Sequence, residues 1–279
     1  MPELPEAEVV AQQIQAHLLG AQIKDCWVGR ADIVREGLPT LPWYLGACLE
    51  RVERYGKSVA LGFQKENELR YVVAELGMTG LLLFRATQTK YPQHVHVRLS
   101  FTGGRESELR YWNPRRFGRL SLLDQTGLDR YRARRFGVDP LTVQRDEFIS
   151  LMEARRGRLK PLLMHQQVIA GIGNIYANEI LFRTKLHPNR EASRLRKAMI
   201  VRLYGTMQTV LREAIACGGS SVKDFFAPDG AEGHYKQHHL VYGKEGQPCP
   251  NRCGRIIRRL QSERSSFVCP ACQICKPPR

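Results

Sequence analysis

Residues 59–84 have the sequence VALGFQKENELRYVVAELGMTGLLLF, in which short apolar runs alternate with polar or glycine-containing segments. Four runs of strand length occur in this part of the chain: Val59 to Phe63, Tyr71 to Leu76, Leu81 to Phe84 and Val95 to Phe101. Short apolar runs separated by Gly, Asn and Pro are typical of all-β sandwiches and barrels. The pattern extends outward from about Gln22 to Leu123, and we predict a β-sandwich over this range.

Helical periodicity flanks the β-rich region on both sides. Residues 5–19 form a predicted helix, because Pro5 suits a first helical turn and the apolar residues after it recur at helical spacing. After Glu147 we expect one helix beginning at Phe148 and three more at Pro161 to Ile169, Asn174 to Phe182 and Ala192 to Ala216. Residues 126–146 are polar and arginine-rich, and we predict a linker there.

The charge balance indicates a polyanionic partner. The chain carries 43 Lys and Arg against 27 Asp and Glu, a formal net charge of +16. Such a surface attracts nucleic acid, although a soluble basic protein or a membrane-surface binder would have the same composition. The arginines are clustered, which suits bidentate phosphate contacts. The clusters are Arg115, Arg116 and Arg119; Arg130, Arg132, Arg134 and Arg135; and Arg252, Arg255, Arg258, Arg259 and Arg264.

Membrane and secretory segments are not expected. The sequence has no run of 18 or more apolar residues, so we predict no transmembrane helix and no membrane partner. Glu3 and Glu6 stand where a secretory signal peptide would carry positive charge, and no long apolar stretch follows them. We therefore expect a cytoplasmic protein.

Four of the eight cysteines form two close pairs, Cys249-x3-Cys253 and Cys269-x2-Cys272, separated by 15 residues. Cysteines in a chain without a signal peptide are thiols or metal ligands before they are disulfides. Four thiolates in two pairs can surround one tetrahedral Zn2+, which would hold the intervening hairpin in place of a core. We predict one structural Zn2+ here. The alternatives are a pair of redox thiols, or a register in which Cys275 of the tail replaces Cys272.

The segment Gly171-Ile172-Gly173-Asn174 interrupts the helical region. Glycines permit backbone conformations that point several N–H groups outward, and the following helix would offer its positive N-terminus to an anion. The segment is therefore either a phosphate-binding turn or an ordinary helix–helix turn with Asn174 as the N-cap. The residues of this segment alone favour neither interpretation.

Four separated motifs together resemble the formamidopyrimidine-DNA glycosylase and endonuclease VIII family over essentially the whole chain. They are Pro2-Glu3-Leu4-Pro5-Glu6, Pro114-Arg115-Arg116-Phe117-Gly118, the stretch from Met164 to Arg190, and the cysteine pairs. The third is similar to the family's helix-two-turns-helix motif. Residues 218–225, GGSSVKDF, resemble the branch acting on formamidopyrimidines and 8-oxoguanine, in which this segment covers the flipped purine.

The resemblance implies an α+β fold of two domains. The first has an N-terminal helix and a β-sandwich, and the second is a helical helix-two-turns-helix domain with a zinc-finger β-hairpin. We expect five parts: a catalytic β-sandwich domain at 1–125, a linker at 126–146, a DNA-binding domain at 147–238 with a lesion-covering loop at 218–238, a zinc finger at 239–273 and a tail at 274–279.

The implied activity is that of a bifunctional DNA glycosylase and abasic-site lyase of bacterial base-excision repair, excising oxidised purines. Removal of Met1 would make Pro2 a secondary amine, and a free α-amino group has a pKa of about 7.7–8.0, so a useful fraction is neutral near pH 7. Its attack on the sugar C1′ gives a Schiff base that permits β- and δ-elimination. Further family roles match Glu3 as general acid, Glu6 as support for the opened sugar, Lys57 in β-elimination and Arg264 in δ-elimination.

The implied partner is double-stranded DNA containing an oxidised base or an abasic site, bound by a monomer. The damaged nucleotide must leave the base stack, so the enzyme has to fill the gap. Met78, Arg115 and Phe117 match the family's gap-filling residues, although core packing would equally explain Met78 and Phe117. The positions that match other DNA contacts are His94, Arg115, Arg156, Asn174 and, on the lesion-covering loop, Lys223.

Three features depart from the family pattern. Glu75 stands where relatives commonly carry a phosphate-binding His, which either weakens a backbone contact or recruits a basic neighbour. Asn113 replaces the usual acidic residue before Pro114. The first cysteine pair has three intervening residues instead of two, a spacing that zinc sites tolerate.

Two other functions fit the same motifs. The chain could excise oxidised pyrimidines, as the endonuclease VIII branch does. It could also be a non-catalytic damage-binding zinc protein, which would bind abasic-site analogues without forming a covalent adduct.

Overall fold

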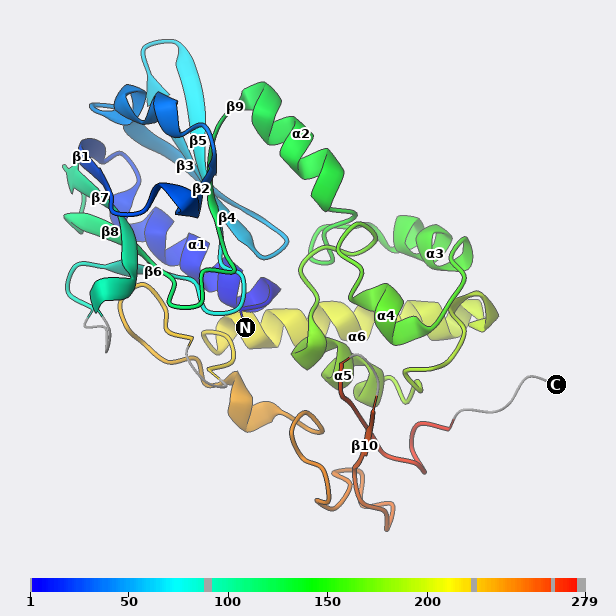
Figure 1. Cartoon of the computed structure of the whole chain (residues 1–279). Coiled ribbons are helices and arrows are strands. Elements are labelled where there is room, and N and C mark those ends of the chain that lie inside the picture. Colours follow the sequence, from blue (N-terminus) through cyan, green and yellow to red (C-terminus); the bar gives the residue numbers. More distant parts are fainter. Residues whose placement is uncertain (1, 88–91, 222–224, 262–263, 275–279) are drawn as a thin grey trace. The chain divides into compact units, whose positions relative to one another are not determined.

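The computed structural model of the chain describes residues 2–87, 92–221, 225–261 and 264–274 (Figure 1). The chain forms two compact units. Unit 1 comprises Met1–Arg135 and Ile215–Lys236, and unit 2 comprises Phe136–Ala214 and Gln237–Arg279. Unit 1 contains the large sheet, and unit 2 contains helices and a small hairpin, so the predicted α+β class is confirmed.

Nine strands of unit 1 form one sheet in the order β2-β9-β5-β4-β3-β1-β7-β8-β6. The strands are β1 (Gln22–Val28), β2 (Val34–Glu36), β3 (Cys48–Tyr55), β4 (Ser58–Lys65), β5 (Glu68–Glu75), β6 (Leu81–Phe84), β7 (Val95–Thr102), β8 (Glu108–Trp112) and β9 (Leu120–Asp124). The four apolar runs of the sequence coincide with β4, β5, β6 and β7. These strand predictions are confirmed.

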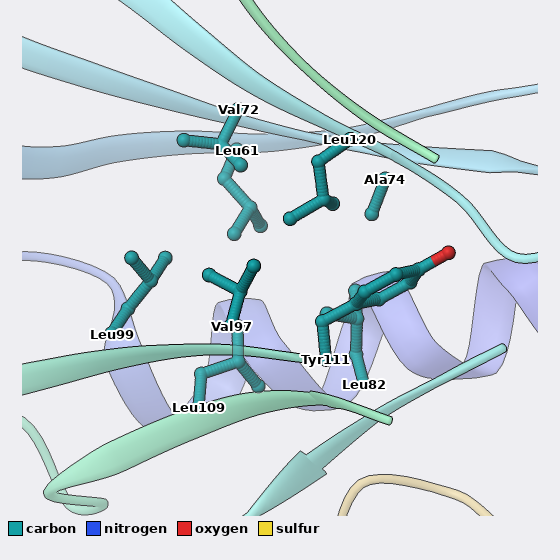
Figure 2. Close-up of a pocket in the computed structure, with 9 residues that line it drawn as sticks. All are labelled: Leu61, Val72, Ala74, Leu82, Val97, Leu99, Leu109, Tyr111 and Leu120. Carbon is teal, nitrogen blue, oxygen red and sulfur yellow. The ribbon is translucent and has the colours of Figure 1, made fainter. Parts of the chain in front are cut away.

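The sheet forms two facing layers, joined where Gln22 of β1 pairs with Cys48 of β3. Figure 2 shows the side chains between the layers, which come from β4, β5 and β9 on one side and from β6, β7 and β8 on the other. They are Leu61, Val72, Ala74 and Leu120, facing Leu82, Val97, Leu99, Leu109 and Tyr111. None is more than 5% exposed. Because this interior is apolar and buried, it is the packed core of the sandwich.

Helix α1 (Leu4–Leu18) begins with a capping box. The Glu3 side chain accepts the N–H of Glu6, and Glu6 Oε2 accepts the N–H of Glu3 at 2.7 Å. This arrangement satisfies two backbone donors that a helix start leaves unpaired. The helix packs against β3 and β4 with its predicted apolar face, Ala7, Val10, Ile14 and Leu18, which is fully buried. The predicted N-terminal helix is therefore confirmed.

The described residues between α6 (Lys197–Ala216) and Lys236 cluster with unit 1, whereas we expected residues 218–238 to be part of the DNA-binding domain. Their backbone is hydrogen-bonded within unit 1, since Phe84 N–H donates to Pro228 O at 2.8 Å. Phe225 is 4% exposed and lies in the same apolar cluster as the buried face of α1. These partners are distant in sequence, so no local pattern indicates them.

Helix α2 (Gln125–Arg135) occupies half of the expected linker and belongs to unit 1. Leu128 is 1% exposed and packs in a second apolar cluster with Tyr71, Val73 and Leu123, to which Tyr131 adds its ring. The helix is otherwise polar. A few apolar contacts with the sheet hold the helix in place. Because its sequence has no amphipathic pattern, it resembles a polar linker.

Unit 2 contains α3 (Arg145–Glu153), α4 (Leu159–Leu163), α5 (Asn174–Arg183) and most of α6. The prediction of a helix up to Ile169 is wrong, because α4 ends at Leu163. The following residues pair with an extended segment instead: Val138 N–H donates to Val168 O and Ala170 N–H donates to Val138 O. No helix among the described residues is long and apolar enough to cross a membrane.

The C-terminal hairpin of unit 2 consists of β10 (Arg258–Leu260) and β11 (Ser266–Val268), paired antiparallel. Beneath it lies a small apolar cluster of Phe182, Val241, Cys249, Ile257, Phe267 and Cys269. Since Phe182 belongs to α5, the hairpin packs against the helix that follows the glycine-containing turn.

Candidate active site and nucleic-acid-binding residues

Pro2, Glu3 and Glu6 lie buried at the start of α1. Both Glu6 oxygens are engaged, Oε2 by the N–H of Glu3 and Oε1 by the N–H of Ser220, each at 2.7 Å. Glu6 therefore ties the start of the chain to the segment after α6, 214 residues further on. The predicted nucleophile, the predicted acid and part of the predicted lesion-covering loop meet here within unit 1.

Lys57 lies in the tight turn between β3 and β4. The side chain of Arg54 links this turn to α1, because its Nε donates to Glu8 at 2.7 Å and its Nη1 to Gly56 O at 3.2 Å. The Arg54 side chain is 6% exposed, so the ion pair with Glu8 is largely shielded from water. The turn carrying Lys57 and the helix start are thus held together within unit 1.

The three predicted gap-filling residues lie on adjacent loops of unit 1. Met78 is 41% exposed and Phe117 is 57% exposed, so the alternative that they are core residues is wrong. The Arg115 guanidinium carbon lies 4.8 Å from the centre of the Phe117 ring. The two loops are in close backbone contact, since a Cβ added to Gly77 would lie 2.5 Å from the nitrogen of Gly118. Two large apolar side chains are therefore exposed to solvent on loops whose backbones touch.

Asn113 joins these two loops and is fully buried. Its Oδ1 accepts the backbone N–H of Arg116 at 3.0 Å and the hydroxyl of Thr79 at 3.3 Å. Its Nδ2 donates to the Tyr111 hydroxyl at 2.9 Å and to Gly118 O at 3.3 Å. An amide supplies donors and acceptors, whereas a carboxylate supplies acceptors only. The departure from an acidic residue at this position therefore adds two donated hydrogen bonds.

His94 and His96 both contact Asn113, the residue that joins the two loops. The backbone N–H of Asn113 donates to His94 O at 2.9 Å, and the His94 ring lies 6.3 Å from the Trp112 ring. His96 is 4% exposed, and its Nε2 donates to Asn113 O at 3.0 Å. Burial lowers the pKa of His96. The imidazole therefore favours the neutral form.

Asn174 is the first residue of α5, and Gly173 is its N-cap. The alternative with Asn174 as N-cap is therefore wrong. Gln166 braces the preceding turn, because its Nε2 donates to Ile172 O and its Oε1 accepts the N–H of Gly171, both at 2.9 Å. Gly171 has a φ of 90°, a conformation that favours glycine. The turn therefore places the positive N-terminal end of the ten-residue helix α5 at Asn174.

Arg264 is exposed in the connection between β10 and β11, and the ammonium group of Lys160 holds the backbone around it. Lys160 Nζ donates to Ser265 O at 2.7 Å, to Ser266 Oγ at 2.9 Å and to Arg264 O at 3.3 Å. Lys160 is only 4% exposed. The predicted δ-elimination residue is thus positioned by a buried lysine of α4.

Two buried polar residues of α5 extend this anchoring. Asn178 Oδ1 accepts the N–H of Phe267 in β11 at 2.8 Å. The Glu179 carboxylate, 0% exposed, accepts the N–H groups of three successive residues at 2.7, 3.0 and 2.8 Å: Leu240, Val241 and Tyr242. Burial raises the pKa of Glu179, and these three donors oppose the rise. No sequence motif marks Lys160, Asn178 or Glu179, although a polar residue inside an apolar helical run signals a buried hydrogen-bond partner.

The four cysteines of the two pairs come together in unit 2, with their sulfur atoms within 4.8 Å of one another. The Sγ–Sγ distance is 3.7 Å between Cys249 and Cys272 and 3.4 Å between Cys253 and Cys269. Tetrahedral Zn–S bonds of about 2.3 Å place sulfurs about 3.8 Å apart, so the group can hold a metal ion. The longer first pair closes with Arg252 at a φ of 52°. The hydrogen bond with Cys269 lowers the pKa of Cys253 to about 7.

The remaining predicted residues are distributed over both units. Arg156 is exposed between α3 and α4, and Lys223 lies outside the described residues. Unit 1 contains Pro2, Glu3, Glu6, Lys57, Met78, His94, Arg115 and Phe117. Unit 2 contains Arg156, Asn174, Arg264, Cys249, Cys253, Cys269 and Cys272.

Comparisons with known proteins agree over nearly the whole chain. Residues 1–120 match the formamidopyrimidine-DNA glycosylase N-terminal domain, and residues 136–226 match the formamidopyrimidine-DNA glycosylase H2TH domain. The chain is 36% identical over 284 residues to formamidopyrimidine-DNA glycosylase of Pelotomaculum thermopropionicum, covering 99% of this chain and 100% of the relative. It is 37% identical over 289 residues to that of Laribacter hongkongensis, covering 98% and 100%.

The solved structures that resemble this chain include Fpg proteins. The MutM (Fpg) protein of Thermus thermophilus is 34% identical with a TM-score of 0.84, covering 99% of this chain and 100% of that one. The Lactococcus lactis Fpg in complex with DNA containing an abasic site has a TM-score of 0.87 at 27% identity, covering 98% and 100%. From its family matches, its full-length relatives and its fold, the chain belongs to the formamidopyrimidine-DNA glycosylase family.

Proposed function

We propose that this protein is a bifunctional DNA glycosylase and abasic-site lyase of base-excision repair that excises 8-oxoguanine and formamidopyrimidines from double-stranded DNA. The observation that carries the proposal is the start of the chain. Pro2 and Glu3 are buried at the first turn of α1, and Glu6 is held at 2.7 Å on both of its oxygens, in a chain that matches the family throughout.

The proposed chemistry starts after removal of Met1. The neutral Pro2 nitrogen attacks C1′ of the damaged nucleotide, and the base leaves with a proton supplied by Glu3. Ring opening gives an iminium ion, which makes a C2′ proton acidic. Loss of that proton expels the 3′ phosphate, and a second elimination expels the 5′ phosphate. No external oxidant or reductant is needed at any step.

Other residues support these steps in the proposal. Glu6 supports the opened sugar, Lys57 assists β-elimination and binds phosphate, and Arg264 assists δ-elimination. DNA contacts are assigned to His94, Arg115, Arg156, Asn174 and Lys223, while Met78, Arg115 and Phe117 fill the gap left by the flipped nucleotide. Exposure of Met78 and Phe117 supports this assignment, because exposed apolar side chains grouped on one surface mark interaction sites.

The cysteine group is proposed to bind one structural Zn2+ through Cys249, Cys253, Cys269 and Cys272. The metal would hold the polypeptide around the hairpin, which has a small apolar cluster for a core. We further propose that the protein acts as a cytoplasmic monomer, in contact with the nucleoid through DNA.

The experiment that tests the function is borohydride trapping on a duplex with 8-oxoguanine opposite cytosine. The native protein is expected to give a covalent adduct, and Pro2→Gly and Glu3→Gln are expected to abolish base excision. Wild-type cleavage by either variant would refute the mechanism. A parallel duplex containing thymine glycol tests the endonuclease VIII alternative, which predicts faster cleavage of that substrate.

Mass spectrometry of the active protein provides an independent check. A retained Met1 would convert the Pro2 nitrogen into an amide, which cannot attack C1′. Tight binding to an abasic analogue with no trapped adduct would instead favour the non-catalytic damage-binding alternative.

A further inference from the structure

Glu75, at the end of β5, is held by arginines from two other elements of unit 1. Its Oε1 lies 3.2 Å from Arg35 Nη1 on β2 and 3.0 Å from Arg135 Nη1 at the end of α2. The Glu75 side chain is 15% exposed, whereas Arg35 and Arg135 are 44% and 37% exposed. A mostly buried carboxylate therefore draws two partly exposed guanidinium groups to one place.

The cluster is more positive than neutralisation of Glu75 requires. One arginine would balance the carboxylate, yet two share the same oxygen atom. Burial raises the pKa of Glu75, and the charges of Arg35 and of a third arginine, Arg119, oppose that rise. The backbone carbonyl of Arg119 also accepts the N–H of Glu75 at 2.8 Å. The two paired guanidinium groups and the one carboxylate therefore leave an excess of positive charge at the end of β5.

The geometry of the two ion pairs leaves donors for a further anion. Each guanidinium carries five N–H donors in a rigid fork, and each pair joins one nitrogen to Glu75. The Arg135 guanidinium carbon also lies 4.8 Å from the centre of the Tyr131 ring, which restricts its rotation. Two restrained, half-exposed guanidinium groups suit bidentate recognition of phosphate oxygens.

The cluster borders the loops that present Met78 and Phe117. A Cβ added to Gly118 would collide with Glu75 O, so the backbones of the two segments touch. The Tyr111 hydroxyl donates to the same carbonyl at 2.8 Å. Any nucleic acid that covers the exposed Met78 and Phe117 would bring its phosphates near the end of β5.

We propose that Arg35 and Arg135 form a phosphodiester-binding site for the DNA backbone, and that Glu75 is a positioning residue that orients both guanidinium groups. This inference rests on the proposed function, since it assigns a contact to the same bound DNA. Glu75 occupies the position at which the sequence motif led us to expect a His, so the positive contact is supplied by its two partners instead.

Substitution of Glu75 by leucine separates two physical expectations. Glu75→Leu has similar volume and raises the net charge by one. If Glu75 merely repels phosphate, the variant will bind DNA more tightly. If Glu75 orients Arg35 and Arg135, the variant will bind less tightly despite its extra positive charge. Glu75→Gln keeps one oxygen acceptor and is expected to lie between the native protein and Glu75→Leu.

The measurement is the equilibrium affinity of the full chain for a duplex containing an uncleavable abasic-site analogue, over a range of KCl concentrations. Each phosphate contact contributes about −0.9 to the slope of log K against log salt, equivalent to about a threefold loss of affinity between 50 and 200 mM. Arg35→Gln and Arg135→Gln are each expected to reduce the steepness by about 0.9. The control is Arg70→Gln, because Arg70 also lies on β5 and pairs with a glutamate, Glu68, at 2.7 Å.

The outcomes distinguish this inference from the proposed function. Borohydride trapping of the native protein on 8-oxoguanine DNA tests the function, and its failure would remove both proposals. If the native protein forms the adduct while Arg35→Gln and Arg135→Gln keep the native affinity and salt slope, only the phosphate site is refuted. Tighter binding by Glu75→Leu would refute the positioning role of Glu75. Arg70→Gln must retain the native slope.

Discussion

Lys160→Met removes the ammonium group that holds the hairpin carrying Arg264, while preserving the length and most of the volume of the side chain. Lys160 Nζ donates to Ser265 O at 2.7 Å and to Ser266 Oγ at 2.9 Å, with a longer contact of 3.3 Å to Arg264 O. Lys160 and Ser266 are each 4% exposed, so water does not readily replace the lost donor. The substitution should therefore weaken the docking of the hairpin on α4 without creating a cavity.

The magnitude follows from the two shorter bonds. Hydrogen bonds to charged groups contribute about 1.5 kcal/mol each at the lower end of their range, so the two give about 3 kcal/mol of docking free energy. A change of 1.4 kcal/mol is a factor of ten, and the equilibrium constant for local opening of the hairpin should rise about 100-fold. The helices of unit 2 are expected to keep their stability.

Amide hydrogen exchange of the peptide containing Phe267 measures this opening. The Phe267 N–H donates to Asn178 Oδ1 at 2.8 Å, so it exchanges when the hairpin leaves α5. An increase of about 100-fold in its exchange rate is expected, with unchanged exchange in α6. Lys197→Met, which removes an exposed lysine at the start of α6, is the matched control. Exchange at the native rate in Lys160→Met would show that Lys160 does not clamp the hairpin.

Three further expectations concern the gap-filling loop, the metal and pH. Phe117→Ala should change the free energy of unfolding by less than about 0.5 kcal/mol, because the ring is 57% exposed, and yet it should slow the excision of 8-oxoguanine. Slower excision that is explained by a matching loss of folded protein would contradict a role of Phe117 in DNA binding. Cys269→Ser should abolish binding of one Zn2+ per chain, as measured with a chromogenic chelator, and weaken DNA binding, since its thiol is 0% exposed among the other three. Burial lowers the pKa of His96, so the unfolded state takes up a proton before the folded state does as the pH falls below about 6.5. The melting temperature should therefore decrease below that pH, and His96→Gln should make the decrease between pH 7 and 5 smaller. An unchanged dependence of the melting temperature on pH in His96→Gln would exclude His96 as its source.

Local patterns predicted those elements whose stabilising contacts are regular. The apolar runs in β4 and β5 alternate with turn residues, and the helical spacing of Ala7, Val10, Ile14 and Leu18 corresponds to a fully buried face of α1. In both cases the periodicity of the side chains matches the periodicity of the backbone, so burial of one face decides the structure.

The helix prediction that is wrong and the helix that sequence reasoning missed share a different cause. The helix expected to reach Ile169 ends at Leu163, because the backbone beyond it hydrogen-bonds to Val138. The expected linker contains α2, which is fixed by a few contacts around Leu128. Such elements are decided by partners far away in the sequence, and a window of neighbouring residues contains no information about those partners.

The residues of the candidate site also fall into two groups, those that a sequence motif marks and those that only their three-dimensional contacts reveal. Motifs identified residues whose chemistry is distinctive, such as the amine of Pro2 and the thiols of the two cysteine pairs. Residues that act through geometry, among them Lys160 and Gln166, were not identified, because a lysine or glutamine in a helical region is ordinarily solvated. Their roles appear only when burial and hydrogen-bond partners are known together.

The three departures from the family pattern each have a compensating partner nearby. The charge of Glu75 is balanced by Arg35 and Arg135, the amide of Asn113 uses its donors as well as its acceptors, and the longer cysteine pair closes through the left-handed conformation of Arg252. A buried charge or a buried amide without partners costs several kcal/mol, so such a change persists only together with its partners. Glu75 and Asn113 are therefore best understood as members of local sets of residues, and substituting either one back to the family residue is expected to destabilise its set instead of restoring the family contact.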